Sequence, residues 1–201
     1  LHKALESSLK GLLPEMSIFQ TIHERRSIKN FTTRSVAREE IEQLLEGVVQ
    51  APNHRMTEPW RFYILGPIAR RAYGAALGGR KGKRVEDPEA AEAVILKVAD
   101  THAALPCMIA ISLVLDDNPE IREEDYAAVF MGLQNLSLAA HHMGLGAHIK
   151  SGAVMEDPLA RAAVGVSDGE RIVATLHLGE PASMPEQKSR KSAIDFTTWV
   201  G

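Results

Sequence analysis

The spacing of hydrophobic residues along the first quarter of the chain predicts three helices. Leucines at three- and four-residue spacing predict a helix over 2–13, which a proline ends. A second helix is expected over 17–25, with Ile18 and Ile22 buried. A third is expected to start near Arg38, because two glutamates follow at positions where the helix dipole favours acids. Its buried stripe is expected to comprise Ile41, Leu44, Leu45, Val48 and Val49.

Later in the chain the same spacing predicts helices at 68–77, 88–100 and 122–143. Another helix is expected to begin at Asp157-Pro158, with Asp as the cap and Pro in the first turn. The helix over 122–143 is the longest. Its apolar stripe is Tyr126, Val129, Phe130, Leu133, Leu136, Ala140 and Met143.

Short runs rich in β-branched residues predict strands between these helices. The four expected strands are 61–65, 108–115, 146–150 and 171–178. Gly78–Arg84 is expected to be a flexible basic loop, and Gly144-Leu145-Gly146 is expected to end the longest helix. Helices outnumber strands and do not alternate strictly with them. The pattern therefore favours an α+β fold, with a sheet covered by helices, over a regular doubly wound fold.

Composition narrows the class of protein without naming its function. The chain has 201 residues, and a hydrophobic content of 45% suits a globular protein. Its net charge of -3 gives no reason to expect nucleic acid or a membrane as partner. We expect one domain over 16–201, preceded by a helical extension over 1–15. The single cysteine, Cys107, is expected in a buried strand. No apolar run is long enough to span a bilayer, and we expect a cytoplasmic location.

Several familiar site signatures are absent from the sequence. There is no phosphate loop, no G-x-G-x-x-G after a strand and no serine-hydrolase elbow. His141 and His142 would point about 100° apart on a helix, so they do not form a chelating pair. We therefore expect no metal site. What remains is a group of basic and small polar residues at three places, each with a structural alternative such as a solvated helix end or a connecting loop.

Together these places resemble the nitroreductase superfamily of flavoproteins. Arg25-Arg26-Ser27-Ile28-Lys29 is similar to the FMN-binding opening of that family, and Ala51–Trp60 to a loop of its compact subgroup. Gly144–Gly152 resembles the segment that lines the flavin ring, and Arg190–Phe196 resembles the C-terminal element. The resemblance covers about residues 16–201. It implies a mixed, mainly antiparallel sheet flanked by helices, in an intertwined homodimer.

The resemblance also implies how FMN is held. Arg25, Arg26 and Ser27 would bind the phosphate and ribityl chain, and Arg190 would join them on the phosphate. The Arg190 assignment is weakened because Ser192 stands where the family's C-terminal motif usually has proline. No metal is implied.

The same resemblance assigns residues to the flavin ring. Lys29 would lie at the N1/O2 edge, where a cation stabilises the charge of the reduced ring. Ser151 and Gly152 would meet the ring near N5 through backbone groups, and Ile149 and Lys150 would line the same face. His54 would come from the partner subunit, packing on the ring, contacting substrate or donating a proton.

The implied activity is ping-pong reduction. NADH or NADPH would give hydride to N5, and a small electron-poor oxidant such as a nitroaromatic or quinone would then take it. No side chain need act as nucleophile. Three alternatives remain open: a flavin-fragmenting or dehalogenating member of the same superfamily, a flavin-binding sensor or reservoir without turnover, and an α+β interaction domain without cofactor. The sequence decides neither the physiological oxidant nor the preferred nucleotide.

Overall fold

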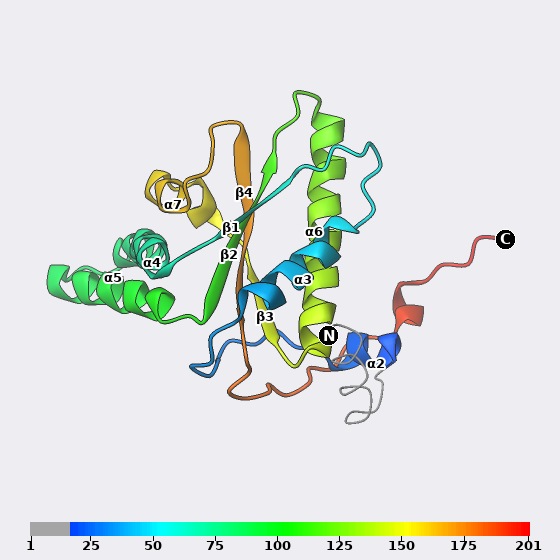
Figure 1. Cartoon of the computed structure of the whole chain (residues 1–201), viewed down its shortest axis with the longest axis horizontal. Helices are drawn as coiled ribbons and strands as arrows, with labels where there is room; N and C mark the ends of the chain where they lie inside the picture. The colour runs from blue at the N-terminus through cyan, green and yellow to red at the C-terminus, as the bar shows by residue number, and fades with distance from the viewer. Residues whose placement is uncertain (1–16) are drawn as a thin grey trace, which may run out of the picture.

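The centre of the protein is a four-stranded sheet. The computed structural model describes residues 17–201, so the helix expected over 2–13 lies outside the described residues. The strands occur in the order β1-β2-β4-β3, and all neighbours are antiparallel (Figure 1). Their bounds are Trp60–Ile64 for β1, Cys107–Val114 for β2, Gly146–Lys150 for β3 and Glu170–Gly179 for β4. A parallel bridge joins Ser27 to Ala147 of β3, which makes the pairing mixed but mainly antiparallel, as expected.

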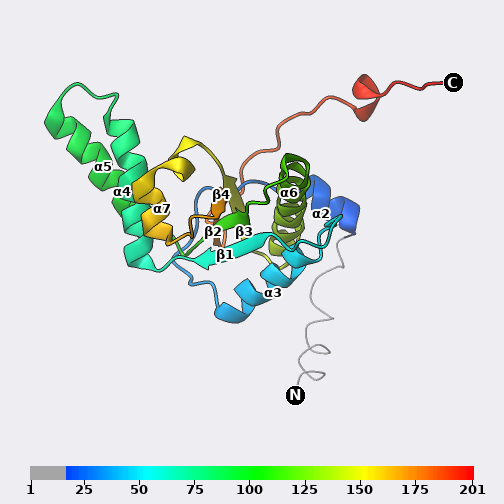
Figure 2. The ribbon, with the colours of Figure 1, turned by 90° about the horizontal axis from the view of Figure 1, so that it is seen from above.

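Helices cover both faces of this sheet (Figure 2). On one face lie α3 and α6, packed on a core that includes Leu44, Ile111, Leu133 and Leu176. On the other face α4 and α7 pack on a smaller core that includes Tyr73 and Met108, and α5 packs against α4. The helices are α2 (Ile18–Glu24), α3 (Arg38–Val49), α4 (Pro67–Gly82), α5 (Pro88–Ala103), α6 (Pro119–His142) and α7 (Pro158–Val164), with two 3₁₀ turns, η1 (Ala153–Glu156) and η2 (Ala193–Phe196).

Local sequence explains where most of these helices begin and end. Proline opens α4, α5, α6 and α7, and the side chains of Asp87, Asn118 and Asp157 accept hydrogen bonds at the starts of the last three. Gly144, just past the end of α6, has a φ of 74° in the left-handed region, which confirms its expected role in ending that helix. The α+β prediction is confirmed, and Cys107 is buried in its strand as expected.

The prediction of a flexible loop over Gly78–Arg84 is wrong, because α4 continues to Gly82. A Cβ atom at Gly78 would lie 2.7 Å from the Cα atom of Ile95 in α5, and one at Gly74 would lie 2.8 Å from the carbonyl oxygen of Val98. The glycines therefore let two helices approach closely, and the packing offsets their low helix propensity.

The expected burial of Ile18 and Ile22 is also wrong within one protomer. Their exposed fractions are 59% and 48%, and the buried residue of α2 is Thr21. In α6, Val129, Leu133, Leu136 and Ala140 are buried as expected, whereas Tyr126 is 40% exposed. Large apolar side chains are exposed again in the C-terminal tail, which extends away from the body (Figure 1). They are Ile194, Phe196, Trp199 and Val200.

Candidate functional site

The segment Arg25–Lys29 runs directly from the end of α2 onto the edge of the sheet. The backbone N–H of Ile28 donates to the carbonyl of Ala147 in β3 at 3.1 Å. This approach needs a glycine at position 146, because a Cβ atom there would lie 2.5 Å from the side chain of Ile28. Gly146 therefore allows the Arg25–Lys29 segment to pack closely against β3, whereas Gly144 ends α6.

Three arginines come together beside this junction. The pKa of Arg25 is lowered, first by partial burial and then by repulsion from Arg190 and Arg26. None of the three has an ion pair with a carboxylate among residues 17–201. Arg26 also donates to the carbonyls of His23 and Arg25 at 2.6 and 2.8 Å, so part of its role is to cap the end of α2. No ion pair with a described carboxylate offsets the positive charge of the cluster, which an anion would neutralise.

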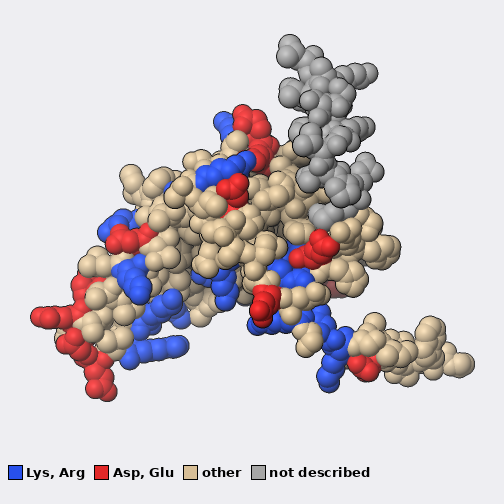
Figure 3. All heavy atoms as spheres, turned by 90° about the horizontal axis from the view of Figure 1, so that it is seen from below, with Lys and Arg blue, Asp and Glu red and all other residues tan. Residues whose placement is uncertain are grey.

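A second group of cations lies beyond β3. Burial lowers the pKa of Lys150, and the charges of Lys81 and Lys29 lower it further. Lys29 comes from the junction segment and Lys81 from the last turn of α4, so three elements contribute one charge each. Seen from below, basic side chains also gather where the C-terminal tail leaves the body (Figure 3).

The end of β3 is open. Ser151 and Gly152 are exposed, Gly152 has a φ of 150°, and a Cβ atom there would meet nothing within 4 Å. A flat group can therefore approach this backbone closely. Ile149 packs against the core on the α3 and α6 face, while Lys150 is half-buried on the opposite face, as the alternation of a strand requires.

The structure does not bring His54 to the arginines of its own protomer. His54 is exposed, and its Nδ1 atom lies 3.0 Å from a carboxylate oxygen of Glu124, near the start of α6. The Arg25 and Arg26 charges instead act on His141, at the end of α6. His141 is 17 positions after Glu124, which corresponds to about 25 Å along the helix. One protomer therefore holds the two halves of the expected site at opposite ends of α6 (Figure 1).

The His54 loop itself is held rigidly. Asp125, which is 2% exposed, accepts hydrogen bonds from Asn53 and Thr57. Met56 and Glu58 have φ values of 50° and 46°, a costly backbone conformation for residues other than glycine. The hydrogen bonds to α6 maintain this conformation and fix the direction in which the loop points.

Sequence reasoning missed a row of histidines beside Lys150. His148 of β3 lies opposite His177 of β4, and the ring centroids are 6.1 Å apart. The ring of His177 in turn lies 5.4 Å from that of His102 in α5. The two-residue alternation of His148 and Lys150 in a predicted strand was the available signal for the first of them.

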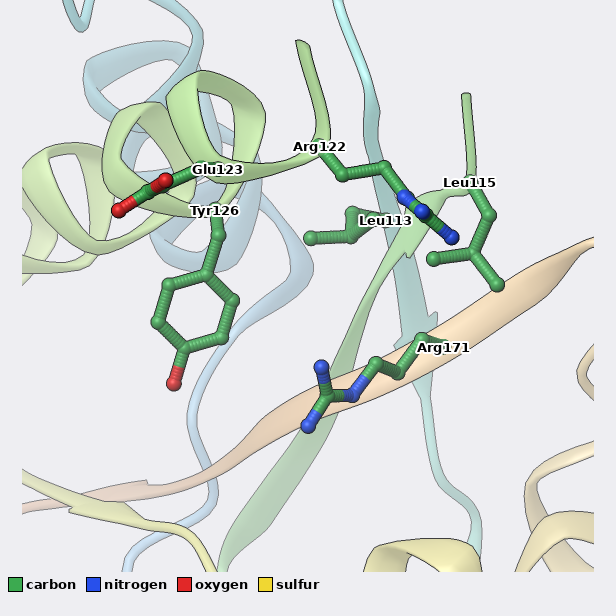
Figure 4. Close-up of a pocket in the computed structure, with 6 residues that line it drawn as sticks. All are labelled: Leu113, Leu115, Arg122, Glu123, Tyr126 and Arg171. Carbon is green, nitrogen blue, oxygen red and sulfur yellow. The ribbon is translucent and has the colours of Figure 1, made fainter. Parts of the chain in front are cut away.

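A cavity of about 310 Å³ lies elsewhere, near the start of α6 (Figure 4). Arg122 and Arg171 point toward it across a floor of Leu113 and Leu115, and Tyr126 forms one wall. None of the predicted site residues lines this cavity. The candidate site is instead an open surface in one protomer, bounded by the arginine cluster, the lysines and the end of β3.

These residues fit a phosphorylated flavin. The arginines, which form no ion pair within residues 17–201, suit a phosphate, and the lysines suit the polar edge of an electron-accepting ring. The open backbone at Gly152 suits the flat ring itself. Two other residues are also placed to bind a phosphorylated flavin. Ser27 is exposed between the arginines and Lys29, and Arg190 reaches the arginine cluster from the C-terminal tail.

Comparison with known proteins gives consistent findings. Residues 22–180 match the model of the nitroreductase family. A Bacillus subtilis protein named as an NAD(P)H nitroreductase is 33% identical over 177 residues, covering 88% of this chain and 91% of its own. A crystal structure of a nitroreductase-like family protein from Bacillus cereus has a TM-score of 0.82 at 30% identity, covering 94% of this chain and 99% of that one. A Desulfovibrio desulfuricans nitroreductase solved in complex with FMN has a TM-score of 0.69 at 22% identity, with 94% and 99% covered.

Proposed function

Because this chain belongs to the nitroreductase family, we propose that it binds FMN and uses NADH or NADPH to reduce small electron-poor molecules such as nitroaromatics or quinones. The B. subtilis relative is named for NAD(P)H, and the D. desulfuricans structure contains FMN, which supports both cofactors. The observation that carries the proposal is the cluster of Arg25, Arg26 and Arg190 beside the start of β3.

The residues of this chain would divide the work of holding the cofactor. Arg25 and Arg190 would bind the phosphate, with Arg26 and Ser27 alongside, and Lys29 would face the N1/O2 edge. Lys150, Ser151, Gly152 and the backbone of Ile149 would support the ring. When bound, FMN supplies the two-electron chemistry in a ping-pong cycle, which removes the need for a nucleophile from the protein. The protein positions the ring and compensates its charge.

The proposal includes a homodimer whose subunits share each site. A single protomer leaves Ile18, Ile22 and several tail residues exposed, which supports a partner surface. The His54 loop lies about 25 Å along α6 from the arginines. We therefore assign His54 to the site of the partner subunit, where it would pack on the ring or contact the oxidant.

Spectroscopy and steady-state kinetics test the cofactor and the activity. The purified protein should be yellow with the absorption of bound FMN, and it should oxidise NADH or NADPH when a nitroarene or quinone is present. A protein that binds FMN without turnover would establish the sensor or reservoir alternative. A colourless protein that takes up no added FMN would refute every flavin-based function.

Sedimentation tests the shared site. At micromolar concentration the mass should be about twice the 22.0 kDa of the chain. Mixing the His54→Ala protein with an Arg25→Ala protein should restore one intact site per mixed dimer if His54 acts across the interface. A monomer that binds FMN at full strength would refute the shared-site arrangement.

A further inference from the structure

His148 occupies an unusual position at the candidate site. It lies two residues before Lys150 in β3, so both side chains face the α4 and α5 side of the sheet. On the neighbouring strand it faces His177, which pairs on its other side with Met108 of the core on that face. His148 is half-buried, so its ring is in contact with both solvent and the interior.

The two rings on the interior side of His148, those of His177 and His102, are poor acceptors for a proton because both are buried. His177 is 6% exposed and His102 is 4% exposed, and the Nε2 atom of each has no protein hydrogen-bond partner among the described residues. His102 donates from Nδ1 to the carbonyl of Val98 at 2.8 Å, which leaves a lone pair on its Nε2 atom. Burial lowers the pKa of His177 to about 3, so this ring stays neutral at physiological pH. A proton on His148 would therefore remain there.

The outward side of His148 is surrounded by cations. Lys150 and Lys29 act on it directly, and Lys81 of α4 acts on Lys150 and on His102. No carboxylate of the described residues shifts its pKa, and Tyr73 of α4 closes the row of rings behind His102. Burial and the two lysines lower the pKa of His148, so the ring is neutral when no anion is present.

These contacts make His148 sensitive to a negative charge arriving beside the lysines. We propose that His148 is the redox-linked proton acceptor of the site: it is neutral while the site is oxidised and takes one proton from solvent when NAD(P)H delivers two electrons. The inference rests on the proposed function. An anion within about 4–6 Å raises the pKa of a neighbouring cation-forming group by 1–3 units, which returns a histidine to the neutral range.

The proton and electron count balances over the cycle. NAD(P)H transfers a hydride, which is two electrons and one proton, so the site gains one negative charge. The proton that His148 takes from water cancels this charge. A quinone or nitro group that then removes the two electrons requires two protons, one transferred with the hydride and one that His148 gives up. His148 thus keeps the charge of the site constant in both half-reactions.

The potential of the FMN-loaded protein as a function of pH tests this assignment. Each proton taken up with two electrons contributes about 30 mV per pH unit. The wild type should show about 60 mV per pH unit near neutrality, and His148→Gln about 30 mV. His142→Gln is the matched control, since this exposed residue lies at the end of α6, and it should keep the wild-type slope.

The protonation of His148 can also be measured directly in the wild-type protein, without the His148→Gln variant. Nitrogen NMR of the wild-type protein should show His148 neutral in the oxidised state and protonated after reduction. A slope of about 30 mV in the wild type, an unchanged slope in His148→Gln, or a neutral His148 in the reduced protein would each overturn the inference. If the protein binds FMN and is reduced by NAD(P)H with a one-proton slope, only this inference fails. If it binds no FMN, the proposed function fails as well.

Discussion

Replacing Arg25 by alanine should weaken FMN binding far more than riboflavin binding. Arg25 follows α2 directly, is half-buried and has no carboxylate partner among residues 17–201, so its guanidinium is available to a phosphate. A hydrogen bond to a charged group contributes about 1.5–3 kcal/mol. Since 1.4 kcal/mol is tenfold in affinity, the dissociation constant for FMN should rise about 10- to 150-fold.

Riboflavin separates the phosphate contact from a general disturbance of the site. It has the same ring without the phosphate, so its affinity should be unchanged in the variant. Arg38→Ala serves as the control, because Arg38 is an exposed arginine of α3 paired with Glu42 rather than a member of the cluster. Fluorescence titration measures all three proteins with both ligands.

The stability of the cofactor-free protein completes the test. Arg26 and Arg190 repel Arg25, so its removal should leave the FMN-free protein at least as stable as the wild type. Equal losses for FMN and riboflavin, or a drop in the melting temperature of the cofactor-free variant, would indicate a structural role. An unchanged FMN affinity would remove Arg25 from the phosphate site.

Three other predictions concern separate parts of the molecule. Lys29→Met should lower the midpoint potential of bound FMN by about 20–65 mV, since a charge contact of roughly 1–3 kcal/mol favours the reduced ring. Spectroelectrochemistry measures this potential, and a change below about 10 mV would show that Lys29 does not lie at the flavin ring. Gly78→Ala should destabilise the protein by about 1–3 kcal/mol, because its Cβ atom would lie 2.7 Å from Ile95. The control Gly79→Ala, whose Cβ atom would meet nothing within 4 Å, should stabilise the protein slightly. Equal melting temperatures for the two variants would contradict the packing argument. Burial holds the pKa of His177 at about 3, below the ordinary value, so between pH 6.5 and 3 the unfolded chain binds more protons than the folded protein. The free energy of unfolding should therefore fall as the pH is lowered through this range, by up to about 1.4 kcal/mol per pH unit. Urea unfolding of wild type and His177→Asn at two pH values measures this difference, which should shrink in the variant.

Much of the architecture follows from local sequence. The period of the apolar residues predicted β3 with its observed bounds and the other three strands to within one residue at each end, because strand side chains alternate between the two faces of the sheet. Asp157-Pro158 and Gly144 predicted helix boundaries through capping and backbone conformation, which depend on a few neighbouring residues. The resemblance to the nitroreductase family likewise rested on short ordered motifs, and the family was confirmed.

Where the sequence failed, the deciding contacts lie far apart along the chain. Gly78 is a poor helix former, and only its packing against Ile95 shows why α4 continues through it. Ile18 and Ile22 have helical spacing, yet that spacing does not reveal whether their cover comes from the same chain. The spacing also gave no distance between Arg190 and Arg25, or between His54 and the arginines; only the resemblance to the family had related these residues to one another.

The sequence by itself determined the four strands, most of the helices and the family. The tertiary structure decided which residues of the site meet. Lys29, Lys81 and Lys150 converge because a glycine at 146 admits Ile28 to the edge of the sheet and because α4 extends as far as Gly82. The physical reason is that propensity and periodicity act over one or two turns of chain, whereas the site depends on close packing between segments separated by tens of residues.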